Sequence, residues 1–194
     1  MPAATPSDWV RRFAPLIRDG GHVLDLAAGT GRHTRLLVDM GLRVTAIDRD
    51  IETLRGFAGS RCDVRQIDLE TGDPAGDPNS VVARLGDGYD GIVVTNYLHR
   101  PLLRPLAAML APGGVLIYET FMTGNEHFGR PRNPEFLLRP GELPEAFAGL
   151  TTVAFEQGEV SRPRPAAIQR IAAIAAPVGL LPEPPFPQRG PAPE

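Results

Sequence analysis

The sequence predicts an α/β protein with a Rossmann-like, doubly wound sheet of seven strands, mostly parallel, with an antiparallel strand near the C-terminus. Three observations carry this prediction. Short apolar runs alternate with segments of helical periodicity, as in parallel strands joined by crossover helices. A Gly-rich turn directly follows the first apolar run, and the next run ends in a carboxylate, Asp48. The last two runs are joined by a short Pro-Arg segment, which indicates a pair of adjacent strands.

The N-terminal half contains three of the predicted strands. Trp9 and Phe13 stand at helical spacing, so we expect a helix over 7–18 with Ser7 as its cap. The apolar run at 22–27 suits a strand that is buried on both faces. The other elements expected here are a helix over 30–40, a strand over 42–48, a helix over 50–57 and a weaker strand over 63–69.

The C-terminal half contains the other four strands. The strongly apolar run at 89–96 predicts a fourth strand, and 115–121 a fifth. Between them we expect a helix over 102–110 and then a break at Ala111-Pro-Gly-Gly114. The remaining expectations are a loop at 71–79, short helices over 80–85 and 143–147, and paired strands over 150–159 and 166–175.

The predicted domain covers residues 1–176. Within it, residues 122–141 are rich in Gly, Asn, Pro and Arg and lack a clear period. An insert of this length after a strand's carboxyl end is more often functional than decorative, so we expect a lid over the substrate. Residues 177–194 are rich in proline and are expected to form a flexible tail.

Composition limits the classes of partner. The net charge is −3 and the pI about 5.8, which disfavours nucleic acid as a partner, although a local arginine patch remains compatible with it. No apolar stretch is long enough for a membrane span, and the N-terminus is unlike a secretory signal. A single cysteine, Cys62, fits a reducing cytoplasm. The histidines and this cysteine lack metal-ligand spacing, so we expect no metal.

Two segments carry a family resemblance. Val23-Leu-Asp-Leu-Ala-Ala-Gly-Thr-Gly31 and Val44-Thr-Ala-Ile-Asp48 resemble the cofactor site of class I S-adenosylmethionine (SAM) dependent methyltransferases. The resemblance covers about 20–175 and is nearest to small bacterial enzymes similar to the tellurite-resistance methyltransferase. It implies SAM as cofactor and S-adenosylhomocysteine as product.

The resemblance also implies roles for individual residues. Asp48 would accept hydrogen bonds from both ribose hydroxyls, and Asp68 would meet the adenine amino group. Ala27 stands where the family usually has glycine. The residues expected to bind the cofactor are Asp25, Ala27, Gly29, Thr30, Gly31, Asp48, Arg49, Asp68, Leu69 and Asn96.

A dinucleotide-binding oxidoreductase is the main competitor for the Gly-rich turn. Its fingerprint requires a small residue three positions after the second glycine, where this chain has Thr34. The carboxylate of Asp25 before the turn also favours SAM. We therefore expect SAM, and not NAD, at this turn.

Methyl transfer requires alignment, exclusion of water and in some cases a base. His99 follows the fourth predicted strand and has a pKa range that suits a base, or it caps and packs the next helix. Tyr97 and Glu119 are the other catalytic candidates, and Glu119 is expected to pair with an arginine or face the pocket. The substrate candidates are Tyr118, Asn125, His127, Arg130 and Arg132.

The acceptor class follows less directly from the sequence. The short chain and acidic pI favour a small-molecule acceptor, and Arg130 with Arg132 would suit an anionic one. An RNA or protein methyltransferase and a SAM-binding regulatory protein without turnover are the alternatives. An open acceptor pocket beside the sulfonium position would distinguish an enzyme from the regulatory protein.

Overall fold

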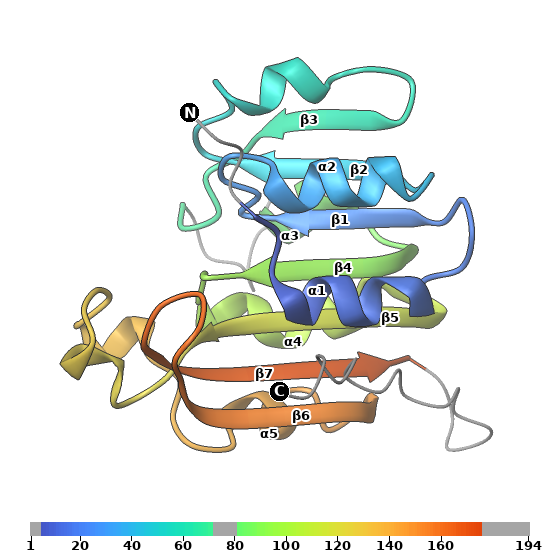
Figure 1. Ribbon diagram of the computed structural model, residues 1–194. Helices are drawn as coiled ribbons and strands as arrows, with labels where there is room; N and C mark the ends of the chain where they lie inside the picture. The colour runs from blue at the N-terminus through green and yellow to red at the C-terminus, as the bar shows by residue number, and fades with distance from the viewer. Residues whose placement is uncertain (1–4, 72–80, 176–194) are drawn as a thin grey trace, which may run out of the picture.

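A seven-stranded sheet in the order β3-β2-β1-β4-β5-β7-β6 forms the centre of the molecule (Figure 1). The computed structural model describes residues 5–71 and 81–175, so the tail expected at 177–194 and nearly all of the loop expected at 71–79 lie outside the described residues. The strands are β1 (His22–Leu26), β2 (Arg43–Asp48), β3 (Cys62–Gln66), β4 (Tyr89–Thr95), β5 (Leu110–Phe121), β6 (Thr151–Val160) and β7 (Ala166–Ile174).

The strand directions confirm the predicted topology. Neighbouring strands from β3 through β5 are all parallel. Strand β7 runs antiparallel to both β5 and β6, and is therefore the reversed strand near the C-terminus. The fold is a Rossmann-like, doubly wound sheet, as the alternation of strands and helices predicts.

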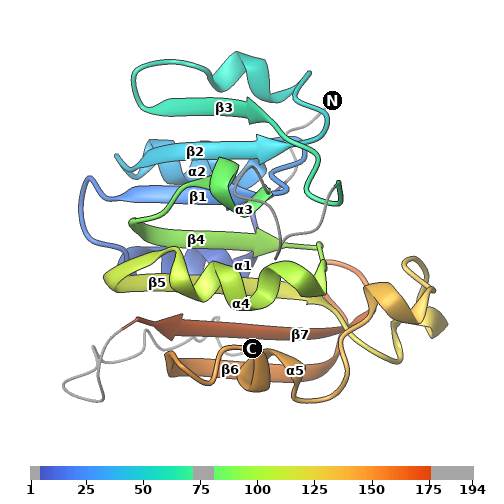
Figure 2. The ribbon, with the colours of Figure 1, turned by 180° about the vertical axis from the view of Figure 1, so that it is seen from behind.

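Helices cover both faces of the sheet. Figure 1 shows α1 and α2 on one face, and Figure 2 shows α3, α4 and α5 on the other. Each face buries its own apolar cluster, one around Trp9 and Phe13 and the other around Tyr118 and Phe147. The helices are α1 (Asp8–Phe13), α2 (Arg32–Asp39), α3 (Val81–Leu85), α4 (Arg100–Ala108) and α5 (Glu142–Ala146), with 3-10 turns η1 (Ala14–Leu16), η2 (Leu54–Phe57), η3 (Asn125–His127) and η4 (Pro134–Phe136).

Two expectations about element boundaries are wrong. The expected break at 111–114 lies within β5, where the Gly113 N–H donates to the Ala175 carbonyl and the Ala175 N–H donates to the Gly114 carbonyl. A side chain at Gly114 would come within 2.7 Å of the Tyr89 carbonyl, so glycine here permits close strand packing.

The expected helix at 50–57 is reduced to the single turn η2. The carboxylate of Asp48 accepts the N–H of Asp50, and that of Asp50 accepts the N–H of Glu52. These local bonds satisfy the backbone in an irregular conformation, which competes with helix formation.

The insert at 122–141 extends from the carboxyl end of β5 (Figure 1). It is attached at both ends, because the Met122 N–H donates to the Ala167 carbonyl and the Leu138 N–H to the Phe121 carbonyl. The buried carboxylate of Glu142 holds the C-terminal end of the insert against α4. It accepts the Arg100 Nε–H at 2.7 Å and the Arg139 backbone N–H at 2.7 Å. Burial raises the pKa of Glu142, but these donors lower it more, so the pKa lies below its ordinary value.

Replacing Glu142 by glutamine should destabilise the protein. The change removes the charged partner of the Arg100 guanidinium, so we expect the free energy of unfolding to fall by about 2–3 kcal/mol at neutral pH. Urea denaturation followed by the fluorescence of Trp9, the single tryptophan, measures this loss. Because Glu142 has a lowered pKa, its stabilisation is present above its ordinary pKa and is lost as the pH falls through the lowered one.

Glu145→Gln is the matched control on the same helix. Glu145 is exposed and lies 3.7 Å from Arg139, so its loss should change stability by less than about 1 kcal/mol. Equal losses in the two variants would contradict the assigned role of Glu142.

Candidate active site

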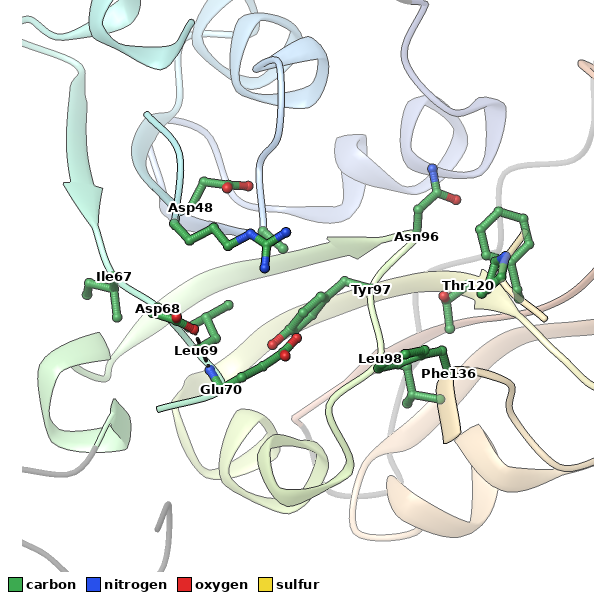
Figure 3. Close-up of a pocket in the computed structure, with 14 residues that line it drawn as sticks. Asp48, Ile67, Asp68, Leu69, Glu70, Asn96, Tyr97, Leu98, Thr120 and Phe136 are labelled. Carbon is green, nitrogen blue, oxygen red and sulfur yellow. Dashed lines mark hydrogen bonds between the residues drawn. The ribbon is translucent and has the colours of Figure 1, made fainter. Parts of the chain in front are cut away.

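A cavity of about 400 Å³ opens at the carboxyl ends of β2, β3 and β4 (Figure 3). It lies where the loops after these parallel strands converge, which is the usual ligand position in an open α/β sheet. The residues that line it are Ala27, Asp48, Arg49, Ile67, Asp68, Leu69, Glu70, Asn96, Tyr97, Leu98, Thr120, Phe121, Pro131 and Phe136. We call this space the first cavity.

Asp48 connects the end of β2 to the Gly-rich turn. One of its carboxylate oxygens accepts the Gly29 N–H at 2.8 Å, and the other accepts the Asp50 N–H at 3.0 Å. The side chain lines the first cavity, where lone pairs that remain on both oxygens can accept ligand hydroxyls. Its expected role as ribose acceptor is compatible with this position and stays a prediction.

The Gly-rich turn needs its left-handed backbone. Gly29 has a φ of 58° and Gly31 a φ of 78°. A Cβ at Gly31 would lie 2.5 Å from the Phe57 ring, so glycine also permits the packing of η2 against the turn. Ala27 has a φ of 54°, which is uncommon for a residue with a side chain and explains a preference for glycine at this position.

Asp25 lies beneath the turn and does not line the first cavity. Its side chain is 2% exposed and accepts the Thr34 hydroxyl at 2.6 Å. Burial raises the pKa of Asp25 to about 6, against the opposing effect of hydrogen bonds from Thr34. Thr34 therefore supports the turn through Asp25, and Thr30 and Gly31 likewise lie outside the cavity lining.

The loop after β3 forms the apolar and acidic end of the first cavity. Ile67 and Leu69 are buried beside it, and the Asp68 carboxylate accepts the Glu70 N–H at 3.0 Å (Figure 3). Arg49 is held from the other side, since its carbonyl accepts the Gln66 side-chain amide at 2.9 Å. Sequence reasoning missed Glu70, although it follows directly after the predicted pair Asp68-Leu69.

Two consecutive residues at the end of β4 point in different directions. Figure 3 shows the Tyr97 ring directed toward Leu69 and Glu70, whereas the Asn96 side chain points away from them. Asn96 has a φ of 55°, and its N–H donates to the Glu119 carbonyl at 2.9 Å. This left-handed backbone turns the two side chains apart.

Tyr97 is a poor base in this environment. Burial raises the pKa of its phenol above the ordinary value, and the carboxylates of Glu70 and Asp68 raise it further. The hydroxyl therefore stays protonated at neutral pH. It is buried and makes no hydrogen bond to any described residue, so its donor is unsatisfied in this structure.

A second cavity of about 250 Å³ adjoins the first. Asn96 and Phe121 line both spaces. The second cavity is otherwise formed by Thr5, Pro6, Ser7, Asp8, Arg32, Glu119, Val160, Arg162, Pro163, Arg164, Ala166, Ile168 and Arg170. Glu119 thus lies beside the second cavity and not the first.

Ser7 connects the N-terminal segment to Glu119, beside the second cavity, and to His33. Its hydroxyl donates to Glu119 at 2.8 Å, and its backbone N–H donates to Nε2 of His33 at 3.0 Å. Burial lowers the pKa of His33 to about 3, and Arg32 adds to that effect, so Nε2 is an unprotonated acceptor at neutral pH. Glu119 also accepts Arg170 at 3.1 Å, which confirms its expected pairing with an arginine.

Several predicted residues line neither cavity. His99 precedes α4, and its buried Nε2 has no hydrogen-bond partner among the described residues. Tyr118 is fully buried, and its hydroxyl donates to the Tyr97 carbonyl at 2.9 Å, so it positions the backbone after β4. The Asn125 amide is engaged with the carbonyl of Pro131 and the N–H of Ala167.

The charged candidates in the insert lie at its surface. His127 and Arg132 are exposed and line neither cavity. Arg130 lines a separate hollow of about 50 Å³ together with Arg164. Within residues 5–71 and 81–175, no three His, Cys, Asp or Glu side chains gather as a metal site.

Comparisons with known proteins agree with this arrangement. Residues 3–133 match a family of sequences described as a methyltransferase domain. A curated relative, glycine N-methyltransferase from Rattus norvegicus, is 28% identical over 148 residues, which cover 66% of this chain and 47% of the relative. The chain therefore spans about half the length of that relative.

Solved structures share the fold. TehB from Haemophilus influenzae superposes with a TM-score of 0.67 at 19% identity, over 88% of this chain and 62% of TehB. The 1,6-didemethyltoxoflavin-N1-methyltransferase of Burkholderia thailandensis, solved with its substrate and S-adenosylhomocysteine bound, has a TM-score of 0.62 at 23% identity, over 87% and 76% of the two chains. Residues 3–133 match the methyltransferase domain, and the Gly-rich turn lies beside Asp48 as in the resemblance described above. The chain therefore belongs to the class I SAM-dependent methyltransferase family.

Proposed function

We propose that this protein transfers the methyl group of SAM to a small-molecule acceptor. The observation that carries the proposal is the pair of adjoining cavities, which meet at Asn96 and Phe121, two residues that line both. The first cavity has carboxylates that can accept hydrogen bonds from ribose hydroxyls and an adenine amino group, and the second has room for a small acceptor beside it. When bound, SAM supplies an electrophilic methyl group on a sulfonium.

The residues of the first cavity suit the parts of the cofactor. Asp48 would accept ribose hydroxyls, and the apolar side chains of Ile67 and Leu69 would cover the adenine, with Asp68 at its amino group. Asn96 lies where the two cavities meet and would hold the end of the cofactor that carries the methyl group. This assignment extends the family resemblance to individual side chains.

The second cavity supports turnover over the regulatory alternative. A protein that only senses SAM needs no space for an acceptor, whereas a space of about 250 Å³ adjoins the cofactor cavity here. Its size suits a small molecule. The names of two similar proteins, glycine N-methyltransferase and 1,6-didemethyltoxoflavin-N1-methyltransferase, also describe methyl transfer to small molecules.

The geometry favours alignment as the main contribution of the protein to catalysis. The Tyr97 hydroxyl is held protonated, and Glu119 is engaged with Ser7 and Arg170. We therefore infer that Tyr97 acts as a hydrogen-bond donor, Glu119 as part of the acceptor-cavity wall, and His99 as a packing residue.

No helix in the described residues is long and apolar enough to cross a membrane. The lone buried thiol of Cys62 supports action in the cytoplasm.

Asp48→Ala should lower the affinity for SAM at least about ten-fold, since a carboxylate that accepts two hydroxyls is lost. Isothermal titration calorimetry with SAM and S-adenosylhomocysteine measures the change. Because Asp48 also accepts the Gly29 N–H, thermal unfolding of the variant should be recorded alongside.

Asp50→Ala is the control for that variant. Asp50 lies two residues further on, does not line the first cavity and accepts only the local N–H of Glu52 among the described residues. Its affinity for SAM should match that of the wild type. Undiminished binding by a folded Asp48→Ala protein would contradict the ribose assignment.

SAM binding should release protons near pH 6. Asp25 has a pKa raised to about 6, so it is partly protonated there, and the positively charged cofactor would favour its ionised form. Calorimetry in buffers of different ionisation enthalpy should detect release at pH 6 and little at pH 8. The pH-6 release should vanish in Asp25→Asn, and its persistence there would exclude Asp25 as the source.

A further inference from the structure

We propose that the acceptor carries a carboxylate or phosphate group, and that Arg162 and Arg164 in the turn between β6 and β7 bind this group in the second cavity. The inference rests on the proposed methyl transfer and names the substrate class. It moves the expected anion site from the insert, where Arg130 and Arg132 were the candidates, to the β6–β7 turn.

The side chains that line the second cavity have an excess of positive charge. Four arginines line it, namely Arg32, Arg162, Arg164 and Arg170, together with the carboxylates of Asp8 and Glu119. Arg170 is already neutralised, because it pairs with Glu119 at 3.1 Å and Glu156 at 2.6 Å. The positive charge that remains is therefore larger than the negative charge.

Arg162 and Arg164 have free guanidinium groups. Among the described residues neither makes an ion pair, and both are exposed at the tip of the turn. Guanidinium groups bind carboxylate and phosphate through paired hydrogen bonds. Arg164 also borders the small hollow that Arg130 lines, which extends the positive charge toward the insert.

The second cavity also has an apolar wall. Phe121, Val160, Ala166 and Ile168 line it beside the charged turn. An acceptor with an apolar body and one anionic group would place that group at the turn and the rest against this wall. Asn96 and Phe121 line both cavities, so the body of the acceptor would lie directly beside the cofactor cavity at these two residues.

The wall opposite the turn is held in place by a network of polar contacts. Ser7 donates to Glu119, Glu119 accepts Arg170, and the Arg170 guanidinium lies 4.7 Å from the centre of the Trp9 ring. The Trp9 indole N–H donates to the Ile171 carbonyl at 3.2 Å, which connects α1 to β7. These contacts hold the N-terminal segment and β7 together. Arg162 and Arg164 can therefore bind a ligand against a wall whose side chains are held in position.

The test uses three small probes on the full-length protein saturated with S-adenosylhomocysteine. Benzoate and phenyl phosphate carry the two anionic groups, and benzamide is the neutral counterpart of benzoate. Binding is measured by calorimetry at low and high salt. We expect at least one anion to bind at least about ten-fold more tightly than benzamide, with an affinity that falls as salt rises.

Arg162→Ala/Arg164→Ala tests the location. This variant should lose at least about ten-fold in affinity for the anion, while its affinity for S-adenosylhomocysteine stays within two-fold of wild type. Arg43→Ala is the control, because Arg43 is exposed at the amino end of β2, whereas the second cavity lies at the carboxyl ends of the parallel strands. Its anion affinity should equal that of the wild type.

Two outcomes overturn the inference. Either both anions bind no better than benzamide, or the double variant binds them as tightly as the wild type does. Which anion binds more tightly then decides between a carboxylate and a phosphate acceptor. The initial titration with S-adenosylhomocysteine separates this inference from the proposed function, because absence of that binding overturns methyl transfer whatever the anions do.

Discussion

The parallel pairing of β1 to β5 is the constraint on which the site depends. Parallel strands all end at one edge of the sheet, and here that edge carries Asp48 at the end of β2, Asp68 after β3 and Asn96 after β4. These residues are far apart in the sequence and line one cavity. The two apolar clusters, one on each face, stabilise the sheet, and the sheet brings these three residues together.

Buried polar groups define the frame around the cavities. Asp25 is satisfied by Thr34, His33 by Ser7 and Thr95, and Glu142 by Arg100 and Arg139. Each would be costly to bury without its partner. Each also joins segments that are separate in the chain, so the same bonds that satisfy these groups orient the Gly-rich turn, the N-terminal segment and the insert.

The reversal of β7 places the β6–β7 turn at the second cavity. Because β7 runs antiparallel to β5 and β6, the turn between β6 and β7 returns to the carboxyl edge of the sheet, beside the insert (Figure 1). This brings Arg162 and Arg164 to the N-terminal segment near Ser7. The same strand carries Arg170, which pairs with Glu119 on β5.

The sequence by itself determined the fold class and part of the lining of the first cavity. Strand ends and glycine turns are local features, so Asp48, Asp68 and Asn96 could be found from apolar runs and their last residues. Only the tertiary structure decided which residues line the second cavity. Contacts between distant segments decide whether Tyr118 faces a cavity, whether His99 packs, and whether Arg162 lines the same cavity as Ser7. Local sequence patterns do not encode these contacts. The same holds for the pKa values of Asp25 and Tyr97, since burial and neighbouring charges arise only when the chain folds.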